Sequence, residues 1–311
     1  MRRRRVAAFL IVAGVGTLVA FSTTSVFGPA QKKGTAEGTK AKPIELPRGG
    51  TTILPNYRVV AYYGSPGGTR LGALGGGTPS QVAEQVADVA SDYGSLQRPV
   101  LPAFELIATI VHPSPGSDGK YRSRLSDEKI DEYLQAARQQ QMLLILDIQP
   151  GRAKFMDEVR HYERWLKDPN VSLALDPEWS MGPGEVPGKV IGRTKASTIN
   201  EVSAYLDQIV QTNKLPQKLL LIHEFTESMV ENRSALVQRA GLATVFNVDG
   251  FGTPVAKIGK YNDLTSDPER PPFVFTGFKL FYEEDTRGGS RVMGPFEVLD
   301  LDPQPDVIVY E

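Results

Sequence analysis

The chain has 311 residues, of which 23% are charged and 41% are hydrophobic, and its formal net charge is −1. This composition is ordinary for a soluble globular protein, and the lack of a basic excess argues against nucleic acid as a partner. The chain contains no cysteine, which excludes disulfide bonds, thiolate metal ligands and attachment of a lipid through a cysteine.

The N-terminus has the features of an export signal. Arg2–Arg5 precede an apolar stretch from Val6 to Phe21, and small residues lie around Ala30. This stretch of 16 residues is short for a transmembrane helix, which needs roughly 20. We expect residues 1–30 to be an export signal, or a signal anchor that tethers the protein to the membrane, and we expect an extracellular or cell-envelope location. Cleavage after Ala30 would remove four of the 35 basic residues and none of the 36 acidic ones, leaving a net charge of −5.

Residues 31–55 are rich in Gly, Lys, Thr and Pro, which predicts a flexible linker. Eight apolar runs follow within residues 56–311, and most of the segments between them have helical periodicity or helix-start signals such as Thr78-Pro79, Ser126 and the capping-box pattern from Thr198 to Glu201. Little helix is expected after the sixth run. The runs are Arg58–Gly64, Val100–Val111, Met142–Ile148, Val171–Asp176, Leu219–His223, Leu242–Asp249, Phe273–Tyr282 and Asp306–Tyr310.

This alternation predicts the fold class. Continuous apolar runs joined by helices are typical of parallel α/β sheets, whose strands are buried on both faces. The length of residues 56–311 favours closure of the sheet into one (β/α)8 TIM barrel. An open doubly wound α/β sheet is the alternative.

In a TIM barrel, functional side chains come from the C-terminal ends of the strands and the loops after them. Glu105 is the most informative of these, because it stands inside an apolar run and an ionisable group is costly to bury unpaired. For any other single residue, a helix cap, a surface carboxylate or a packed ring explains the position about as well. The predicted substrate-binding set is Glu105, Asp147, His223, Asp249, Tyr63, Trp179, Lys279 and Tyr282.

The sharpest local pattern is Asp176-Pro177-Glu178, at the end of the fourth run. If the chain is still extended there, residues i and i+2 point to the same side and both carboxylates face one cleft. Two carboxylates in one pocket push their pKa values apart and leave one protonated, as general acid catalysis of glycosidic bond cleavage requires. Asp176 and Glu178 are therefore the predicted catalytic residues.

Two segments, VVAYYGS from Val59 and LDPEW from Leu175, resemble the chitinase-type (family 18) glycoside hydrolases. The resemblance implies an exported TIM barrel in which Glu178 is the general acid and Asp176 orients the substrate. The chain departs from that family at Val171 and Ala174, where the family pattern has two further Asp residues. The whole chain also resembles a group of exported proteins of high-GC Gram-positive bacteria that carry QPGR and DPEWxMGPGEVPG segments, which implies a family and no activity.

The hypothesis that follows is an exported glycoside-hydrolase-like barrel, without a cofactor, that acts on a cell-envelope or extracellular polysaccharide. Two alternatives stay open. The same acids and His223 are suitable ligands for Mg, Mn or Zn in a metal-dependent barrel hydrolase or isomerase. The barrel could also bind a glycan or the cell wall without catalysis.

Overall fold

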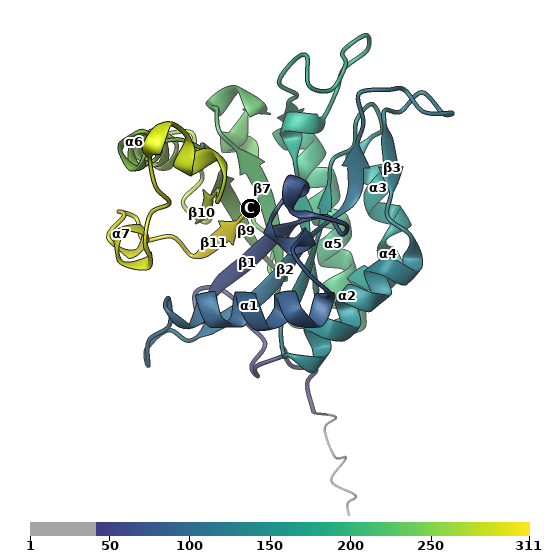
Figure 1. The fold of residues 1–311 in the computed structure, drawn as a ribbon. Helices are drawn as coiled ribbons and strands as arrows, with labels where there is room; N and C mark the ends of the chain where they lie inside the picture. The colour runs from purple at the N-terminus through teal and green to yellow at the C-terminus, as the bar shows by residue number, and fades with distance from the viewer. Residues whose placement is uncertain (1–41) are drawn as a thin grey trace, which may run out of the picture. The chain divides into compact units, whose positions relative to one another are not determined.

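The computed structural model describes residues 42–311. Eight parallel strands form a barrel in the order β1-β11-β10-β9-β7-β5-β4-β2, and β2 pairs with β1 to close it (Figure 1). Closure confirms the predicted TIM barrel and excludes the open doubly wound sheet. The barrel strands are β1 Arg58–Gly64, β2 Val100–Val111, β4 Leu143–Ile148, β5 Val171–Leu175, β7 Lys218–Glu224, β9 Leu242–Val248, β10 Phe275–Leu280 and β11 Val307–Tyr310.

Three short strands lie outside the barrel. The long strand β2 continues past its barrel neighbours and pairs there with the antiparallel strand β3, Arg122–Arg124. The other two, β6 Thr194–Lys195 and β8 Val230–Glu231, pair with each other in parallel. Each of these strands lies in a connection that follows the C-terminal end of a barrel strand, so they shape that end of the barrel.

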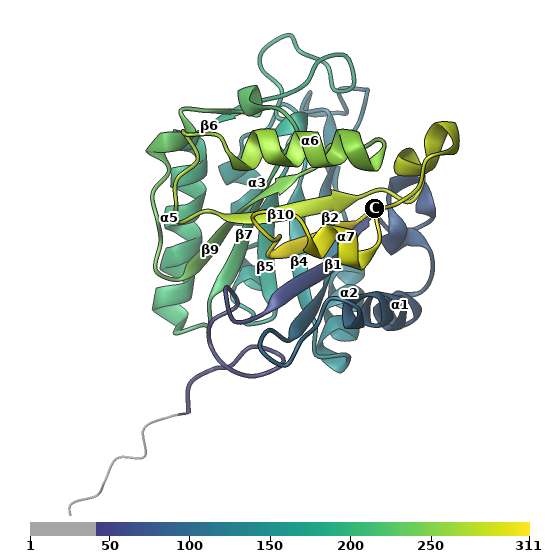
Figure 2. The ribbon, with the colours of Figure 1, turned by 90° about the vertical axis from the view of Figure 1, so that its left-hand side faces the viewer.

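The helices lie around the strands, with α5 beside β9 and α6 above β10 in the turned view (Figures 1 and 2). Thr78 caps α1 in a capping box and Ser126 caps α2, as their sequence signals predict. Among the described residues no α-helix lies between β7 and β9. The helices are α1 Pro79–Ser91, α2 Asp127–Gln139, α3 Phe155–His161, α4 Glu163–Leu166, α5 Ala196–Asn213, α6 Pro254–Thr265 and α7 Pro295–Leu299.

Two helix predictions were wrong. Helix α5 begins at Ala196, before the expected cap at Thr198, because β6 ends at Lys195 and the chain turns directly into the helix. Helix α6 has 12 residues although little helix was expected there. Its apolar stripe is weak because one of its buried positions is Lys257, whose ammonium donates to the backbone oxygens of Gly250 and Lys279.

Side chains alternate between the two faces of the barrel strands, and two apolar cores result. One core fills the barrel interior and includes the small residues Ala61, Ala103 and Ala174. The other lies between the strands and the surrounding helices. This alternation decides which residues near the strand ends point into the barrel.

The N-terminal segment of the described chain belongs to the interior core. Leu46, Ile53 and Leu54 are buried there, and the backbone N–H groups of Ile53 and Leu54 donate to Gln217 Oε1 at 2.8 and 3.0 Å. Gln217 immediately precedes β7, so this segment closes the N-terminal end of the barrel. Residues 42–55 are therefore part of the barrel domain, which corrects that part of the expected linker of residues 31–55. Residues 31–41 lie outside the described residues.

The expected membrane tether is also corrected. Within residues 42–311, no helix combines the length and the apolar character needed to cross a membrane. The predicted signal of residues 1–30, with its apolar stretch, lies outside the described residues.

Candidate functional site

A layer of polar side chains occupies the C-terminal end of the barrel interior. Each member lies two residues after a small or apolar interior position, so the strand alternation carries it to the inside. Ala61 leads in this way to Tyr63, Ala103 to Glu105 and Leu221 to His223. The complete polar layer, with one residue from or directly after each barrel strand, is Tyr63, Glu105, Asp147, Asp176, His223, Asn247, Lys279 and Glu311.

His223 is the centre of the buried part of this layer. Its Nε2 lies 2.7 Å from Glu105 Oε1, and its Nδ1 lies 2.7 Å from Asp249 Oδ2. Burial alone would lower the pKa of His223, but the charges of Asp249 and Glu105 outweigh it and raise the pKa well above its usual value. Burial likewise disfavours the charged form of Asp249, and the positive charges of His223 and Lys279 overcome this and lower its pKa. Asn247 Nδ2 donates to Asp249 Oδ1 at 2.6 Å.

Asp147 lies beside this histidine and is fully buried. Its Oδ2 accepts a hydrogen bond from the hydroxyl of Tyr63 at 3.3 Å, and that hydroxyl accepts one from Gln149 Nε2 at 3.0 Å. Burial raises the pKa of Asp147 to about 7, against the opposing effect of the His223 charge. The protonation of Asp147 therefore depends on the charge of the neighbouring His223.

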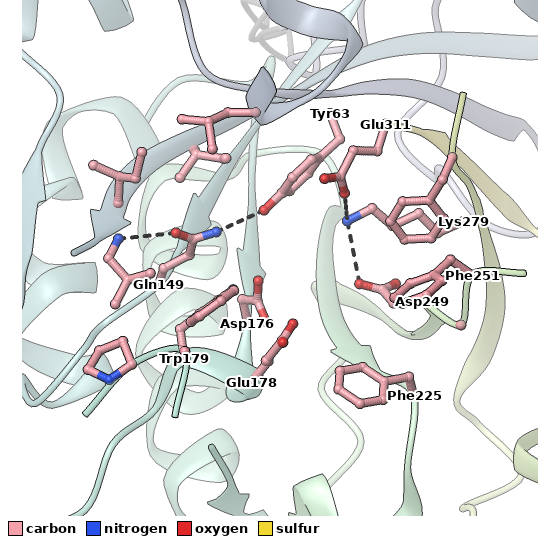
Figure 3. Close-up of a pocket in the computed structure, with 18 of the residues that line it drawn as sticks. Tyr63, Gln149, Asp176, Glu178, Trp179, Phe225, Asp249, Phe251, Lys279 and Glu311 are labelled. Carbon is pink, nitrogen blue, oxygen red and sulfur yellow. Dashed lines mark hydrogen bonds and ion pairs between the residues drawn. The ribbon is translucent and has the colours of Figure 1, made fainter. Parts of the chain in front are cut away.

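A pocket of about 800 Å³ opens above the polar layer (Figure 3). Asp176 and Glu178 point into it from one wall, while Asp249, Lys279 and Glu311 lie on the other side. Its volume is within the range of small-molecule sites, which combine apolar walls with a few placed polar groups. The aromatic residues of its lining are Tyr63, Trp179, Phe225, Phe251 and Phe281.

Lys279 is held in place by the groups around it. Its Nζ lies 2.7 Å from Glu311 Oε2, 3.5 Å from Asp249 Oδ2 and 3.6 Å from the centroid of the Tyr63 ring. These contacts outweigh its burial and raise the pKa of Lys279 above its usual value. Lys279 is therefore a fixed positive charge on one side of the pocket.

The segment that carries Asp176 and Glu178 is not extended, which corrects the geometry assumed from the sequence. Strand β5 ends at Leu175, and Pro177–Trp179 form a 3-10 turn in which Trp179 N donates to the backbone oxygen of Asp176. Proline fixes its own φ near the helical value, and this favours the turn. Both carboxylates nevertheless line the pocket.

Burial raises the pKa of Glu178 to about 7, and the negative charges of Asp249 and Glu311 contribute. The pKa of Asp176 is raised well above its usual value by burial and by the charge of Asp147. Both acids therefore hold protons far more strongly than ordinary carboxylates do, and Glu178 changes its protonation state near neutral pH.

Gly192 packs against the backbone of the turn that carries Glu178. Gly192 N donates to the Glu178 backbone oxygen at 2.7 Å. A Cβ at position 192 would lie 2.4 Å from that oxygen and 2.6 Å from the oxygen of Pro177. Only glycine permits this close approach, so the loop after the turn holds Glu178 through its backbone.

The structure places nine of the ten predicted site residues in or directly beneath the pocket. Tyr282 is the exception and is a correction: its ring stacks on Tyr310, and its hydroxyl lies 3.1 Å from that of Tyr62. It follows the inward-facing Phe281 and so points outward. Of the nine predicted residues, six line the pocket and three lie beneath it. Those in the lining are Tyr63, Asp176, Glu178, Trp179, Asp249 and Lys279, and those beneath it are Glu105, Asp147 and His223.

The predicted set left out three polar residues that the site uses, namely Gln149, Asn247 and Glu311. Glu311 stands two residues after the interior residue Val309, so the alternation of inward and outward side chains along the strand could have identified it as an inward residue. Gln149, at the end of the third apolar run, joins two strands because its Oε1 accepts a hydrogen bond from Val111 N at 3.1 Å. The apolar wall residues Phe225, Phe251 and Phe281 lie in loops or at a strand end and carried no signal.

No protein-family model matches the chain, and no match is found among curated protein sequences. These comparisons give no support to the expected polysaccharide or glycan partner. The size of the pocket instead favours a small ligand.

Proposed function

We propose that the protein is a hydrolase of glycoside-hydrolase type that cleaves a small glycoside, with Glu178 as the general acid. The observation that carries this proposal is the position of Glu178 on the pocket wall together with a pKa raised to about 7. A catalytic acid works best when its pKa lies near the operating pH, because it is then protonated and can still release its proton.

The other side of the pocket supplies the second carboxylate. Asp249 lines the pocket, Asn247 donates to its Oδ1, and the ammonium of Lys279 lies 3.5 Å from its Oδ2. These partners favour an ionised carboxylate, which is what a nucleophile or general base requires. Burial raises the pKa of Asp176 well above its usual value and so favours its protonated form, which can donate a hydrogen bond to the substrate.

The aromatic lining supports a sugar-sized substrate. Trp179 and Phe225 lie near Glu178 in the pocket wall, and Phe251 lies on the side of Asp249 (Figure 3). Phe281 also lines the pocket, with its ring centroid 5.9 Å from that of Phe251. Flat rings of this kind pack against the apolar face of a sugar ring. A pocket of about 800 Å³ accommodates one or two such rings.

The test is hydrolysis of a panel of aryl mono- and diglycosides by the full-length chain. For the substrate that is cleaved, Glu178→Gln should lower kcat by roughly 10²–10⁴-fold. The activity of the original protein should fall as the pH rises through about 7, because Glu178 then loses its proton. Glu84→Gln, at an exposed position on α1, is the control and should retain full activity. Hydrolysis that persists undiminished in Glu178→Gln, or no hydrolysis of any glycoside, would refute the proposal.

A further inference from the structure

Beneath the pocket, three ligand-type side chains converge from three strands of the barrel. Glu105 of β2, Asp147 of β4 and His223 of β7 each offer one atom, and these atoms lie within 4.8 Å of one another. All three side chains are buried, and none of them lines the pocket. None of the three is among the residues assigned to substrate cleavage, and Asp249 of that set contacts His223 Nδ1 at 2.7 Å.

Two oxygens of this group lack the partners that their burial requires. Within the described part of the chain, Glu105 Oε2 and Asp147 Oδ1 have no hydrogen-bond partner. A buried carboxylate oxygen without a partner costs free energy, and the cost is larger when the group is charged. Asp147 Oδ1 lies 3.9 Å from His223 Nε2, so the unsatisfied oxygen is close to the imidazole.

We propose that Glu105, Asp147 and His223 bind a divalent transition-metal ion, with Zn²⁺ or Mn²⁺ as the fitting ions. One imidazole nitrogen with two carboxylates makes a mixed nitrogen and oxygen ligand set, which suits these ions better than Mg²⁺ or Ca²⁺. Two carboxylates also neutralise the charge of the dication. This site goes beyond the proposed hydrolase activity and does not depend on it.

The neighbouring residues orient the three ligands as an outer shell does. Asp249 Oδ2, 2.7 Å from His223 Nδ1, accepts a hydrogen bond from the Nδ1–H group, and the Nε2 lone pair then faces Glu105 and Asp147. The hydroxyl of Tyr63 donates to Asp147 Oδ2 and leaves Oδ1 free. A carboxylate behind a metal-binding histidine is the usual way in which proteins fix its tautomer and ring orientation.

The competing arrangement is a buried imidazolium. In that state His223 donates from Nε2 to Glu105 Oε1 across the 2.7 Å contact, and the ion is replaced by a proton. This arrangement satisfies Glu105 Oε1 but leaves Glu105 Oε2 and Asp147 Oδ1 without partners. A metal ion bound between the three side chains satisfies these oxygens as well, which is why we favour it.

The test measures metal directly and needs no substrate. The full-length chain, purified without chelators, is analysed for metal by plasma mass spectrometry. It is then stripped with a chelator and unfolded thermally with Zn²⁺, Mn²⁺, Mg²⁺ or Ca²⁺. We expect about one Zn²⁺ or Mn²⁺ per chain, and a rise in Tm of roughly 5 °C at a metal concentration 100-fold above Kd. Mg²⁺ and Ca²⁺ should give smaller shifts.

Variants locate the site. Glu105→Gln and His223→Gln should lose both the bound metal and the rise in Tm. Glu224→Gln, at a buried carboxylate next to His223 but outside the group of three, should retain both. If a ligand variant does not fold, the metal content of the original protein and its response to the chelator still decide. A protein that carries no metal and responds to none of the four ions, or a Glu105→Gln variant that binds metal normally, would overturn the proposal.

Discussion

The contact between Gly192 and the Glu178 backbone makes a sharp prediction for Gly192→Ala. The added Cβ would lie 2.4, 2.6 and 2.7 Å from the Glu178 oxygen, the Pro177 oxygen and the Ser180 nitrogen, all of which are backbone atoms. Because no flexible side chain can yield, the 3-10 turn or the loop must move. Overpacking of this kind costs about 1–3 kcal/mol of unfolding free energy. For a chain of this size that corresponds to a fall in Tm of roughly 2–10 °C.

The displacement should also change the site. A catalytic group misplaced by about 1 Å can lose on the order of 10²-fold in rate, so Gly192→Ala should reduce hydrolysis by a comparable factor. A second measurement does not depend on activity. Trp179 lies in the turn that must move, whereas the other tryptophan, Trp165, is buried in the outer core. The fluorescence emission should therefore shift through Trp179 while the fold is retained.

Gly259→Ala is the matched control for this substitution. Gly259 lies inside α6, and an added Cβ there meets no atom within 4 Å. Alanine is the better helix former, so this variant should be stabilised by up to about 1 kcal/mol. If Gly192→Ala unfolds at the temperature of the original protein and keeps its fluorescence and rate, the loop does not hold Glu178 as we infer.

Two further predictions concern stability. Ile53→Ala should lower the unfolding free energy by about 2–5 kcal/mol, because it leaves a cavity at a fully buried position at the closed end of the barrel. Denaturant unfolding measures this change. An unchanged midpoint would mean that residues 42–55 do not contribute to the stability of the barrel. The pKa of Glu178 is raised from its ordinary value of 4.5 to about 7, so the folded state binds this proton more tightly. Stability should therefore fall as the pH rises from about 4.5 through 7. The loss should be on the order of 1–3 kcal/mol, and a Glu178→Gln variant with the same pH dependence would contradict it.

The barrel could be predicted because its strands are buried on both faces. Such strands are continuous apolar runs, and the predicted and observed bounds of β1 and β2 coincide. Helix α6 escaped prediction because its buried face includes Lys257, and an ammonium that finds backbone carbonyl partners does not look like a core residue in sequence. Local sequence patterns predict an element best when its buried face is entirely apolar, and the buried Lys257 makes α6 an exception.

The site was predicted from residues at the C-terminal ends of the strands, and the direction in which each side chain points follows from the alternation of inward and outward residues along a strand. Counting alternate residues from Ala61 to Tyr63, or from Val309 to Glu311, identifies inward positions, and applying this rule to every strand would have found Glu311 and excluded Tyr282. This counting cannot be continued past the end of a strand, because side chains alternate between inward and outward positions only while the backbone is extended. The 3-10 turn at Pro177–Trp179 is such a place, and there the sequence identified the residues but not their geometry.

Depth along the barrel axis is the information that a single strand cannot provide. Glu105 stands in the middle of β2, yet it pairs in register with Tyr63, the penultimate residue of β1. The residues of β2 beyond Leu106 extend past the end of β1, where Ile107, Ile110 and Val111 become part of the pocket wall. Because only the stagger between closed strands sets this depth, an acid inside an apolar run can be recognised from sequence as unusual. Its place in the floor beneath the pocket, beside a histidine more than 100 residues away in the chain, follows only from the closed barrel.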